Sequence, residues 1–492
     1  MPTDPLLERA ALQLKKRAQT EGIDPSPTAA LLKGGRYADA LKEARRGCEA
    51  SGASPAYARW IGLSAAFASQ PAEAEPWLLL ATQFDPRDAQ AHAVLGAVGG
   101  VLGRVDRVRH HRQAVELEPR NAQFRASCAD ALLEAGELDE AEQAARAALA
   151  LSADYGPALS VFGRVLYAQG KPANAFALLE AALPAAKDHH AERALAFLYL
   201  RAGRYQEGFR HYESCRRSIN FGMSELRSGP PEWLGEPIPG QRLLIRHEQG
   251  MGDTLMAMRY AAILAERGVQ VSATVNRPLE RLLAAQPYLK RVYGPGARIS
   301  ITQYDRWCYA MSLPGRVGED GSSGRRVPYI AAPAGEIDFG SDSRGLKVGI
   351  SWQGNRANPH DALRSIEPGR FAALASVPGV CLISCQHGVD SAALPAFVRP
   401  PPVTINDLAD AAMLLKHLDL LITVDSAPAH LAGAMGLEVW LLARWFGDWR
   451  WADTGSATHW YPTMRVLRQP AAGDWRTPLA EVASSLKKRR PG

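Results

Sequence analysis

The chain has 492 residues, 47% of them hydrophobic and 22% charged, with a formal net charge of +6. This length predicts roughly two to four domains, and the composition is typical of globular proteins with ample apolar side chains for a core. The modest charge and the lack of a nucleic-acid-binding module exclude nucleic acid as an expected partner. No apolar run of about eighteen residues is present and the N-terminus lacks a signal-peptide pattern, so we expect a cytoplasmic protein without a membrane span.

The sequence contains no convincing metal or redox site. Its six cysteines, at positions 48, 128, 215, 308, 381 and 385, form no CxxC pair, so we expect reduced, buried thiols. No convincing Asp-x-Asp pair or zinc-type His/Glu spacing is present, and we therefore expect neither a metal nor a bound cofactor. The basic residues 487–490 predict a solvated tail, with contact to an acidic membrane surface or polymer as the alternative.

The first part of the chain, residues 1–221, carries an internal repeat. Glycines at positions 35, 103, 136, 170 and 203 are 68, 33, 34 and 33 residues apart, and Ser69 falls midway in the longest gap. Five residues after these positions come Ala40, Ala74, Val108, Ala141, Ala175 and Gly208. Small residues at this period resemble tetratricopeptide repeats, each a pair of helices joined by a tight turn. We expect about six repeats over residues 22–220, preceded by a capping helix near residues 4–20.

Stacked helical pairs bury a continuous core and curve into a groove. We expect this groove to bind a protein or glycan acceptor, with a spacer or a dimerisation surface as the alternative. The next segment, residues 222–240, is rich in proline and glycine and predicts an ordered linker in which Trp233 and Leu234 dock. A fragment that begins near Pro230 is therefore expected to keep a core of its own.

Residues 241–345, the first half of the remaining chain, open with RLLIRHEQGMGDTLMAMRYAAILAERGVQVSATV. This pattern predicts a strand, a glycine turn, a helix and a second strand. Gly250 and Gly252 permit a tight turn and a close approach to a ligand. Asp253 is expected at the start of the helix, where its carboxylate either lies at the edge of a cleft or caps the helix. Residues 318–345 are interpreted as the crossing into the second half.

The second half, residues 346–492, contains LLITVDSAPAHLAGAMGLEVWLL at residues 420–442. The pattern predicts a buried strand, a helix and another strand, with Asp425 just past the first strand. Ser426 is expected to cap the helix and Pro428 to lie in its first turn. Such a helix start favours a phosphate group, and His430 lies one turn inside the helix. The alternatives are that Asp425 and Ser426 form a plain cap and that His430 is a satisfied core residue.

Further polar residues follow other predicted strands of this half. Asn355 and Gln386 are expected at the carboxyl ends of two strands. Arg364 is suited to a diphosphate because its guanidinium donates hydrogen bonds in a fixed fork, although a surface ion pair is the alternative. The aromatic residues of 445–461 indicate core packing or, alternatively, stacking on a base or sugar.

Two of these segments resemble motifs of known glycosyltransferases. Asp425, Ser426, His430 and Gly433 match the diphosphate-binding signature of the lipopolysaccharide heptosyltransferase-like group, with serine in place of the commoner threonine. Glu248, Gln249, Gly250, Gly252 and Asp253 match the opening motif of the tetratricopeptide-linked members. The resemblance implies a GT-B fold with two Rossmann-like halves, a nucleotide-sugar donor on the second half, Asp253 as catalytic base, and inverting, metal-independent transfer.

From these patterns we predict an α-solenoid over residues 1–221, a linker over 222–240, and two Rossmann-like halves over 241–345 and 346–492. The predicted activity is sugar transfer from a nucleotide-diphosphate sugar to a hydroxyl-bearing protein or glycan, with Glu248, Gln249, Gly250 and Gly252 on the acceptor side. A non-catalytic adaptor with a degenerate transferase domain and a nucleotide-sugar epimerase are the two alternatives. The presence of both Asp253 and the segment from Asp425 to His430 argues against the adaptor.

Overall fold

The computed structural model describes residues 26–51, 55–184, 189–218, 229–340, 345–356, 358 and 360–489. The chain divides into two compact units, one reaching to Ala191 together with residues 358–362, the other containing the remaining residues from Glu192. The predicted capping helix near residues 4–20 and the first part of the predicted linker lie outside the described residues.

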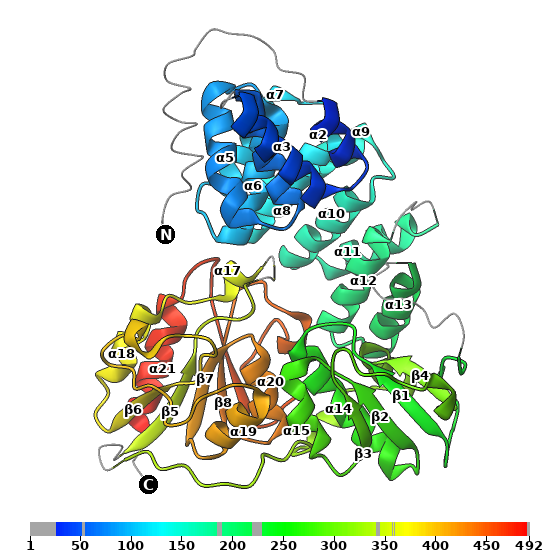
Figure 1. Cartoon of the computed structure of the whole chain (residues 1–492), viewed down its shortest axis with the longest axis vertical. Coiled ribbons are helices and arrows are strands. Elements are labelled where there is room, and N and C mark those ends of the chain that lie inside the picture. The colour runs from blue at the N-terminus through cyan, green and yellow to red at the C-terminus, as the bar shows by residue number, and fades with distance from the viewer. Residues whose placement is uncertain are drawn as a thin grey trace. The chain divides into compact units, whose positions relative to one another are not determined.

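The first unit is a helical solenoid, as the repeat spacing predicts (Figure 1). Consecutive helices pack on one another along the chain. They are α2 (Ser26–Lys33), α3 (Tyr37–Ser51), α4 (Pro55–Phe67), α5 (Pro71–Phe84), α6 (Ala89–Leu102), α7 (Arg107–Leu117), α8 (Ala122–Ala135), α9 (Leu138–Leu151), α10 (Gly156–Ala168) and α11 (Pro172–Ala182).

The predicted turn positions all have a left-handed backbone, with φ between 61° at Ser69 and 81° at Gly136. This conformation is easy for glycine and strained for most other residues, which explains the regular glycine spacing. The alanines five residues after the turns are fully buried between helices, and Val108 is also buried. At Gly208 an added Cβ would lie 2.6 Å from Leu200 Cγ, so the helices are too close there for a side chain.

The last helical pair, α12 (His190–Arg201) and α13 (Tyr205–Ser218), lies almost wholly in the second unit. Leu200, Phe209 and Tyr212 belong to the same buried cluster as Leu243 and Leu255 of the first half. The boundary between compact units therefore falls near residue 191, not at the predicted linker 222–240. The physical reason is that the apolar faces of these two helices are buried against the sheet-containing part of the chain.

The first half contains a parallel sheet in the order β3-β2-β1-β4, drawn in green in Figure 1. Its strands are β1 (Arg242–Arg246), β2 (Gln270–Thr274), β3 (Leu289–Tyr293) and β4 (Arg306–Tyr309). Its main helices are α14 (Met251–Glu266), α15 (Glu280–Ala284) and α16 (Leu313–Val317). The chain order reverses between β1 and β4, and the carboxyl ends of strands at such a point are where parallel sheets bind ligands.

The second half contains a parallel sheet in the order β6-β5-β7-β8-β9. Its strands are β5 (Leu346–Ser351), β6 (Val380–Ser384), β7 (Leu420–Val424), β8 (Val439–Ala443) and β9 (Met464–Arg468). Its helices are α17 (Asp361–Arg364), α18 (Ala372–Ala375), α19 (Leu408–Lys416), α20 (Ala427–Ala434) and α21 (Arg476–Lys488). All residues of β7 and β8 are buried, as expected for central strands covered on both faces.

The described part of the predicted linker docks on the first half through one of the two expected side chains. Trp233 is buried, and its Nε1 donates to the Glu236 carbonyl at 2.7 Å. Leu234 is 61% exposed, so the prediction for this residue is wrong. Its backbone N–H donates to the Glu236 carboxylate at 3.0 Å, and the turn that this bond closes leaves the Leu234 side chain in solvent.

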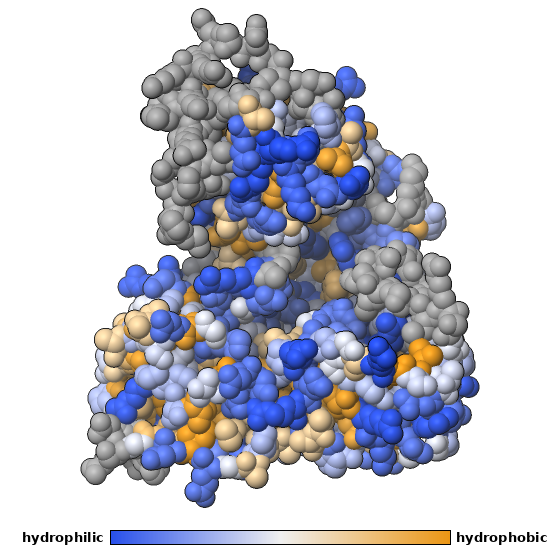
Figure 2. Space-filling view, in the orientation of Figure 1, coloured by the Kyte–Doolittle hydropathy of each residue, from blue (hydrophilic) through white to orange (hydrophobic). Residues whose placement is uncertain are grey.

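The six cysteines are buried, as expected. Among the described residues no helix is long and apolar enough to cross a membrane. Hydrophilic residues cover most of the described surface visible in Figure 2, and hydrophobic residues lie among them in small groups. In the predicted basic tail, Arg489 pairs with Glu438 at 2.7 Å and is therefore held to the fold.

The shared core predicts where the chain can be shortened. A fragment beginning at residue 230 loses α12 and α13 and exposes the apolar surface that Leu200, Phe209 and Tyr212 cover. Each such buried side chain contributes about 1.5–3 kcal/mol, so the loss should approach the whole stability of a domain. We expect a fragment beginning at residue 189 to melt cooperatively near the intact protein and the shorter one to melt far lower or not at all. Equal melting temperatures would show that the two helices add no stability.

Candidate functional site

The two motif-bearing helices of the second unit, α14 and α20, pack directly against each other. Gly252 lies at the start of α14 and faces His430 of α20. A Cβ added at Gly252 would lie 2.5 Å from His430 Cδ2, a distance that no side chain tolerates. Gly252 therefore permits the close approach of the two halves, whereas the sequence had suggested an approach to a ligand.

Asp253 occupies the first turn of α14, where it both caps the helix and pairs across the halves. Its Oδ2 accepts a hydrogen bond from Gly250 N at 3.0 Å, as in the cap alternative. Its Oδ1 forms an ion pair with Arg450 of the second half. Burial raises the pKa of Asp253, although Arg450 opposes that shift. Both carboxylate oxygens of Asp253 therefore have partners within the protein, and its side chain is 22% exposed.

Arg450 lies in the aromatic segment, where the sequence assigned it no role in the site, and it is a buried cation of this site. Its side chain is 6% exposed and pairs with Asp253 and, at 2.9 Å, with Asp448. Its guanidinium also lies 4.2 Å from the centroid of the Trp449 ring. Burial alone would raise the pKa of Asp448, but Arg450 holds it below its usual value. One feature of the sequence could have identified Arg450: it occurs with Asp448 in the aromatic segment 445–461. A single charge buried without a partner would be costly there, so the two opposite charges indicate a buried pair.

Asp425 follows β7 directly, as predicted, and Ser426 occupies the first position before α20. Burial raises the pKa of Asp425 to about 6, and the nearby charge of Asp448 adds to this shift. The expected side-chain cap is absent, because the buried Ser426 hydroxyl donates to the Val424 carbonyl at 3.1 Å. The serine side chain therefore leaves the start of α20 uncapped, and Pro428 in the first turn contributes no N–H.

His430 is buried and has the environment of a neutral core histidine. Its Nδ1 lies 2.9 Å from the Tyr461 hydroxyl, and its ring centroid lies 5.1 Å from that of Trp451. Burial lowers the pKa of His430 to about 3, with Arg450 contributing in the same direction. A neutral imidazole offers one N–H donor and no charge, so any contact with a ligand would be an uncharged hydrogen bond.

Gly433 and Gln386 have packing and backbone roles in the structure. A Cβ at Gly433 would lie 2.5 Å from Tyr461 Cγ, so this glycine accommodates the ring. The Gln386 side chain accepts from the backbone N–H groups of Trp352 and Gln353 at 3.1 and 3.0 Å. It also donates to the Gln353 carbonyl at 3.1 Å, so these contacts fix the chain where β5 ends.

The remaining predicted donor residues lie in the loop region after β5. Asn355 is exposed, and Arg364 is half-buried at the end of α17. The positive charge of Arg364 opposes the rise in the pKa of Asp425, which places the two groups within electrostatic range. The structure therefore brings Arg364 into the neighbourhood of the α20 start and leaves Asn355 at the surface.

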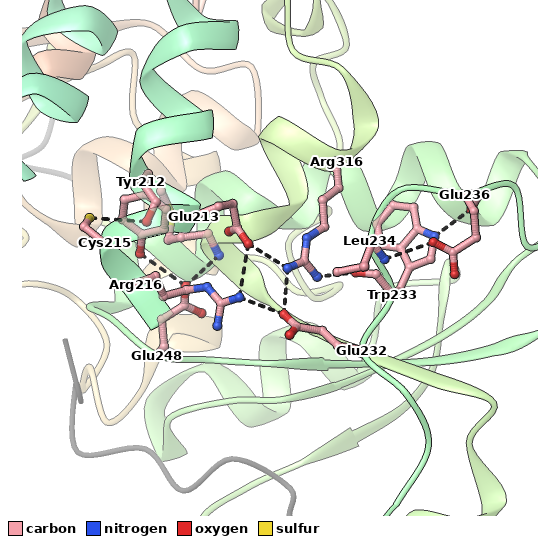
Figure 3. Close-up of polar contacts among 11 residues, drawn as sticks. Tyr212, Glu213, Cys215, Arg216, Glu232, Trp233, Leu234, Glu236, Glu248 and Arg316 are labelled. Carbon is pink, nitrogen blue, oxygen red and sulfur yellow. Dashed lines mark hydrogen bonds and ion pairs between the residues drawn. The ribbon is translucent and has the colours of Figure 1, made fainter. Parts of the chain in front are cut away.

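Glu248 and Gln249 follow β1 and contact a side chain from α13. Figure 3 shows Glu248 beside this side chain, Tyr212. Glu248 Oε1 accepts from Met311 N at 3.0 Å and from the Tyr212 hydroxyl at 3.4 Å. Gln249 Nε2 donates to the same hydroxyl at 2.5 Å. Burial raises the pKa of Glu248 to about 8. Tyr212 belongs to no motif of the sequence and precedes Glu248 by 36 residues, so no sequence pattern indicated its part in the site.

The arrangement combines groups with different protonation states near the junction of the halves. Glu248 is a neutral carboxylic acid at neutral pH, whereas Asp253 lies beside a permanent cation. The start of α20 presents the positive end of a short helix dipole. Such a site can accept a proton, donate a hydrogen bond and hold an anion. Within the described ranges, no group of three or more His, Cys, Asp or Glu residues is placed to hold a metal ion.

No family model matches the chain. Protein FlbA of Caulobacter vibrioides (strain ATCC 19089 / CIP 103742 / CB 15) is 24% identical over 341 residues, which cover 60% of this chain and 54% of FlbA. The chain thus spans about half the length of this relative.

Two solved structures of low similarity align with about a third of the chain. TTC0263, a thermophilic TPR protein of Thermus thermophilus, is 22% identical with a TM-score of 0.30, covering 33% of this chain and 91% of that one. MamA (41-end) from Desulfovibrio magneticus RS-1 is 14% identical with a TM-score of 0.30, covering 32% and 90%.

The Arg450 pairing predicts a specific loss of stability. Arg450→Met removes the buried cation from two carboxylates and should lower the free energy of unfolding by about 3 kcal/mol, because uncompensated charge remains. Arg281→Met is the matched control, since Arg281 also joins the halves through Asp407 and Asp410 but is 55% exposed. Arg281→Met should lower the free energy of unfolding by less than about 1 kcal/mol. Equal losses in urea unfolding would contradict a special role for Arg450.

The burial of His430 predicts a pH dependence. Histidine ordinarily titrates near 6.5, whereas the pKa of His430 is lowered to about 3. Between these values the unfolded chain binds a proton that the folded protein excludes, so stability should fall as the pH is lowered. His430→Asn should flatten this slope by at most about 1.4 kcal/mol per pH unit. Denaturant unfolding at several pH values measures the slope, and an unchanged slope would show that His430 titrates normally.

Proposed function

We propose that the second unit is a glycosyltransferase of the GT-B arrangement that moves a sugar from a nucleotide-diphosphate sugar to a hydroxyl acceptor. One observation carries the proposal: the two segments that resemble glycosyltransferase motifs lie far apart in the sequence, yet Gly252 and His430 pack together. The parallel sheets on either side support the same interpretation, since each presents the carboxyl ends of its strands to loops that carry the motif residues.

On the donor side, the diphosphate would lie at the start of α20, near Asp425 and within reach of Arg364. The leaving group gains negative charge as the bond to the sugar breaks, and backbone N–H groups with the helix dipole stabilise that charge. The proline in the first turn reduces the number of N–H groups at the start of α20. The guanidinium of Arg364 would therefore contribute more to stabilising the negative charge of the leaving diphosphate. A nucleotide-diphosphate sugar is the one co-substrate that the proposal requires.

On the acceptor side, Asp253 would act as general base. The acceptor oxygen forms a bond to the anomeric carbon, the bond from that carbon to the phosphate oxygen breaks, and the electron pair leaves with the diphosphate. The acceptor proton passes to the Asp253 carboxylate. A higher pKa makes a carboxylate a stronger base, so the burial that raises the pKa of Asp253 favours this role, and the charge of Arg450 opposes part of that rise.

The adaptor alternative also has a supporting observation. Both oxygens of Asp253 already have partners within the protein, as a purely structural residue would. In that case the halves would form a binding platform and the repeats would recruit another protein. Product analysis with nucleotide sugars separates the possibilities, because a transferase yields transferred or hydrolysed sugar, an epimerase yields an isomerised donor, and an adaptor yields no product.

Asp253→Asn tests the mechanism. The amide can still accept from Gly250 N but cannot take a proton, so turnover should fall about 10²–10⁴-fold while donor affinity changes little. Asp448→Asn is the matched control, because it removes the other carboxylate partner of Arg450. Turnover by product analysis and donor affinity by calorimetry are measured for both variants. Near-normal turnover of Asp253→Asn, or equal losses in both variants, would contradict a base role.

A further inference from the structure

The last helical pair contacts both halves of the second unit. Towards the second half, the Tyr205 hydroxyl lies 2.6 Å from His459 Nδ1, and Arg201 donates to the Gly447 carbonyl at 2.6 Å. Towards the first half, Tyr212 reaches Glu248 and Gln249. The side chains of α12 and α13 therefore extend into the region where the two motif segments meet.

A buried ion cluster fixes α13 to the first half (Figure 3). Arg216 pairs with Glu213 at 3.1 Å and with Glu232 at 2.7 Å. Arg316 pairs with the same two carboxylates at 2.7 and 2.6 Å and also donates to the Trp233 carbonyl. Both arginine side chains are 5% exposed. Because buried charges must keep their partners, this cluster sets the position of α13 and hence of Tyr212.

Glu248 has one oxygen without a hydrogen-bond partner among the described residues. Its Oε1 is engaged by Met311 N and the Tyr212 hydroxyl, whereas its Oε2 is buried and unpartnered. Such a group is costly in a folded protein and calls for an explanation such as a ligand or a water molecule. Glu248 follows β1 and contacts the loop after β4, at the point where the strand order reverses. Ligands of parallel sheets bind at this place.

We propose that Glu248 Oε2 forms a hydrogen bond that orients the hydroxyl acceptor, and that Tyr212 of the last repeat helix is the positioning residue that holds the Glu248 carboxyl. This inference rests on the proposed transferase function. It makes the last helical pair a component of the acceptor site, because the Tyr212 hydroxyl also accepts from Gln249 and so fixes two residues of the same loop.

The surroundings of Glu248 determine what it offers to the acceptor. Burial raises the pKa of Glu248 to about 8, and the charge of Asp253 adds to the rise. The N–H of Met311 and the charge of Arg216 oppose it. The carboxyl is therefore protonated at neutral pH and donates to an oxygen of the acceptor, while Asp253 accepts the proton of the reacting hydroxyl. Two neighbouring carboxyl groups with different environments thus have different roles.

The test compares Tyr212→Phe with Tyr205→Phe in the full chain. Both remove one hydroxyl from α13, but Tyr205 bonds to His459 and not to Glu248. Release of nucleoside diphosphate is measured with UDP-glucose, GDP-mannose and ADP-glucose as donors and methyl glycosides as acceptors. Tyr212→Phe should raise the acceptor KM about ten-fold or more, the loss expected for a positioning hydrogen bond, and leave the donor KM within about two-fold. Tyr205→Phe should change neither constant.

The pH profile adds a readout that a purely structural role would not change. Activity should fall with a limb near pH 8 as Glu248 ionises. Tyr212→Phe should move this limb to higher pH, because the ionised carboxylate loses a donor. Glu248→Gln, which cannot ionise, should keep measurable turnover and lose the limb, and it also serves as a second variant if Tyr212→Phe folds poorly.

The outcomes distinguish the two proposals. Wild-type turnover with equal behaviour of Tyr212→Phe and Tyr205→Phe would overturn the positioning role alone. Abolished turnover in a folded Glu248→Gln would overturn the donor role, since an ionised carboxylate would then be required. Absence of turnover by the wild-type protein with every donor would overturn the transferase proposal and this inference together.

Discussion

The ion pair between Arg450 and Asp253 is the interaction on which the arrangement of the two halves depends. Arg450 comes from a loop of the second half and pairs with Asp253 at the start of α14 in the first half. Removing either partner would leave a charge with little access to water, so the halves have a strong preference for the geometry that keeps them paired. The close contact of Gly252 with His430 follows from the same geometry, because both pairs lie at the α14–α20 junction.

Gly252 and Gly433, one from each motif, are both required by the close packing at this junction. Gly252 admits the His430 ring, and Gly433 admits the Tyr461 ring to which His430 is hydrogen-bonded. The glycines therefore allow a chain of close contacts that runs from α14 through α20 to the aromatic segment after β8. The aromatic side chains of that segment also pack against the last helical pair: Trp449 lies edge-on to Phe209 of α13, with centroids 5.9 Å apart.

Sequence patterns predicted the local elements well because these depend on short-range physics. The repeat turns follow from the backbone freedom of glycine, and the strand at residues 420–424 follows from an uninterrupted apolar run. The side-chain contacts of the site depend on pairing between distant segments. No local pattern could show that Arg450 neutralises Asp253 or that Tyr212 reaches Glu248. The unit boundary was missed for the same reason, since the apolar face of α13 is recognisable but its partner is not.

The incorporation of α12 and α13 into the second unit has a consequence for how such a chain can change during evolution. In a solenoid each repeat contacts only its neighbours, so whole repeats can be gained or lost without disturbing a distant part of the array. That freedom ends at α12, because the side chains of the last pair are fixed in register with loops of both sheets. Removal of the final helical pair would break contacts with loops of both sheets, so we expect this pair to be retained wherever the two sheets are.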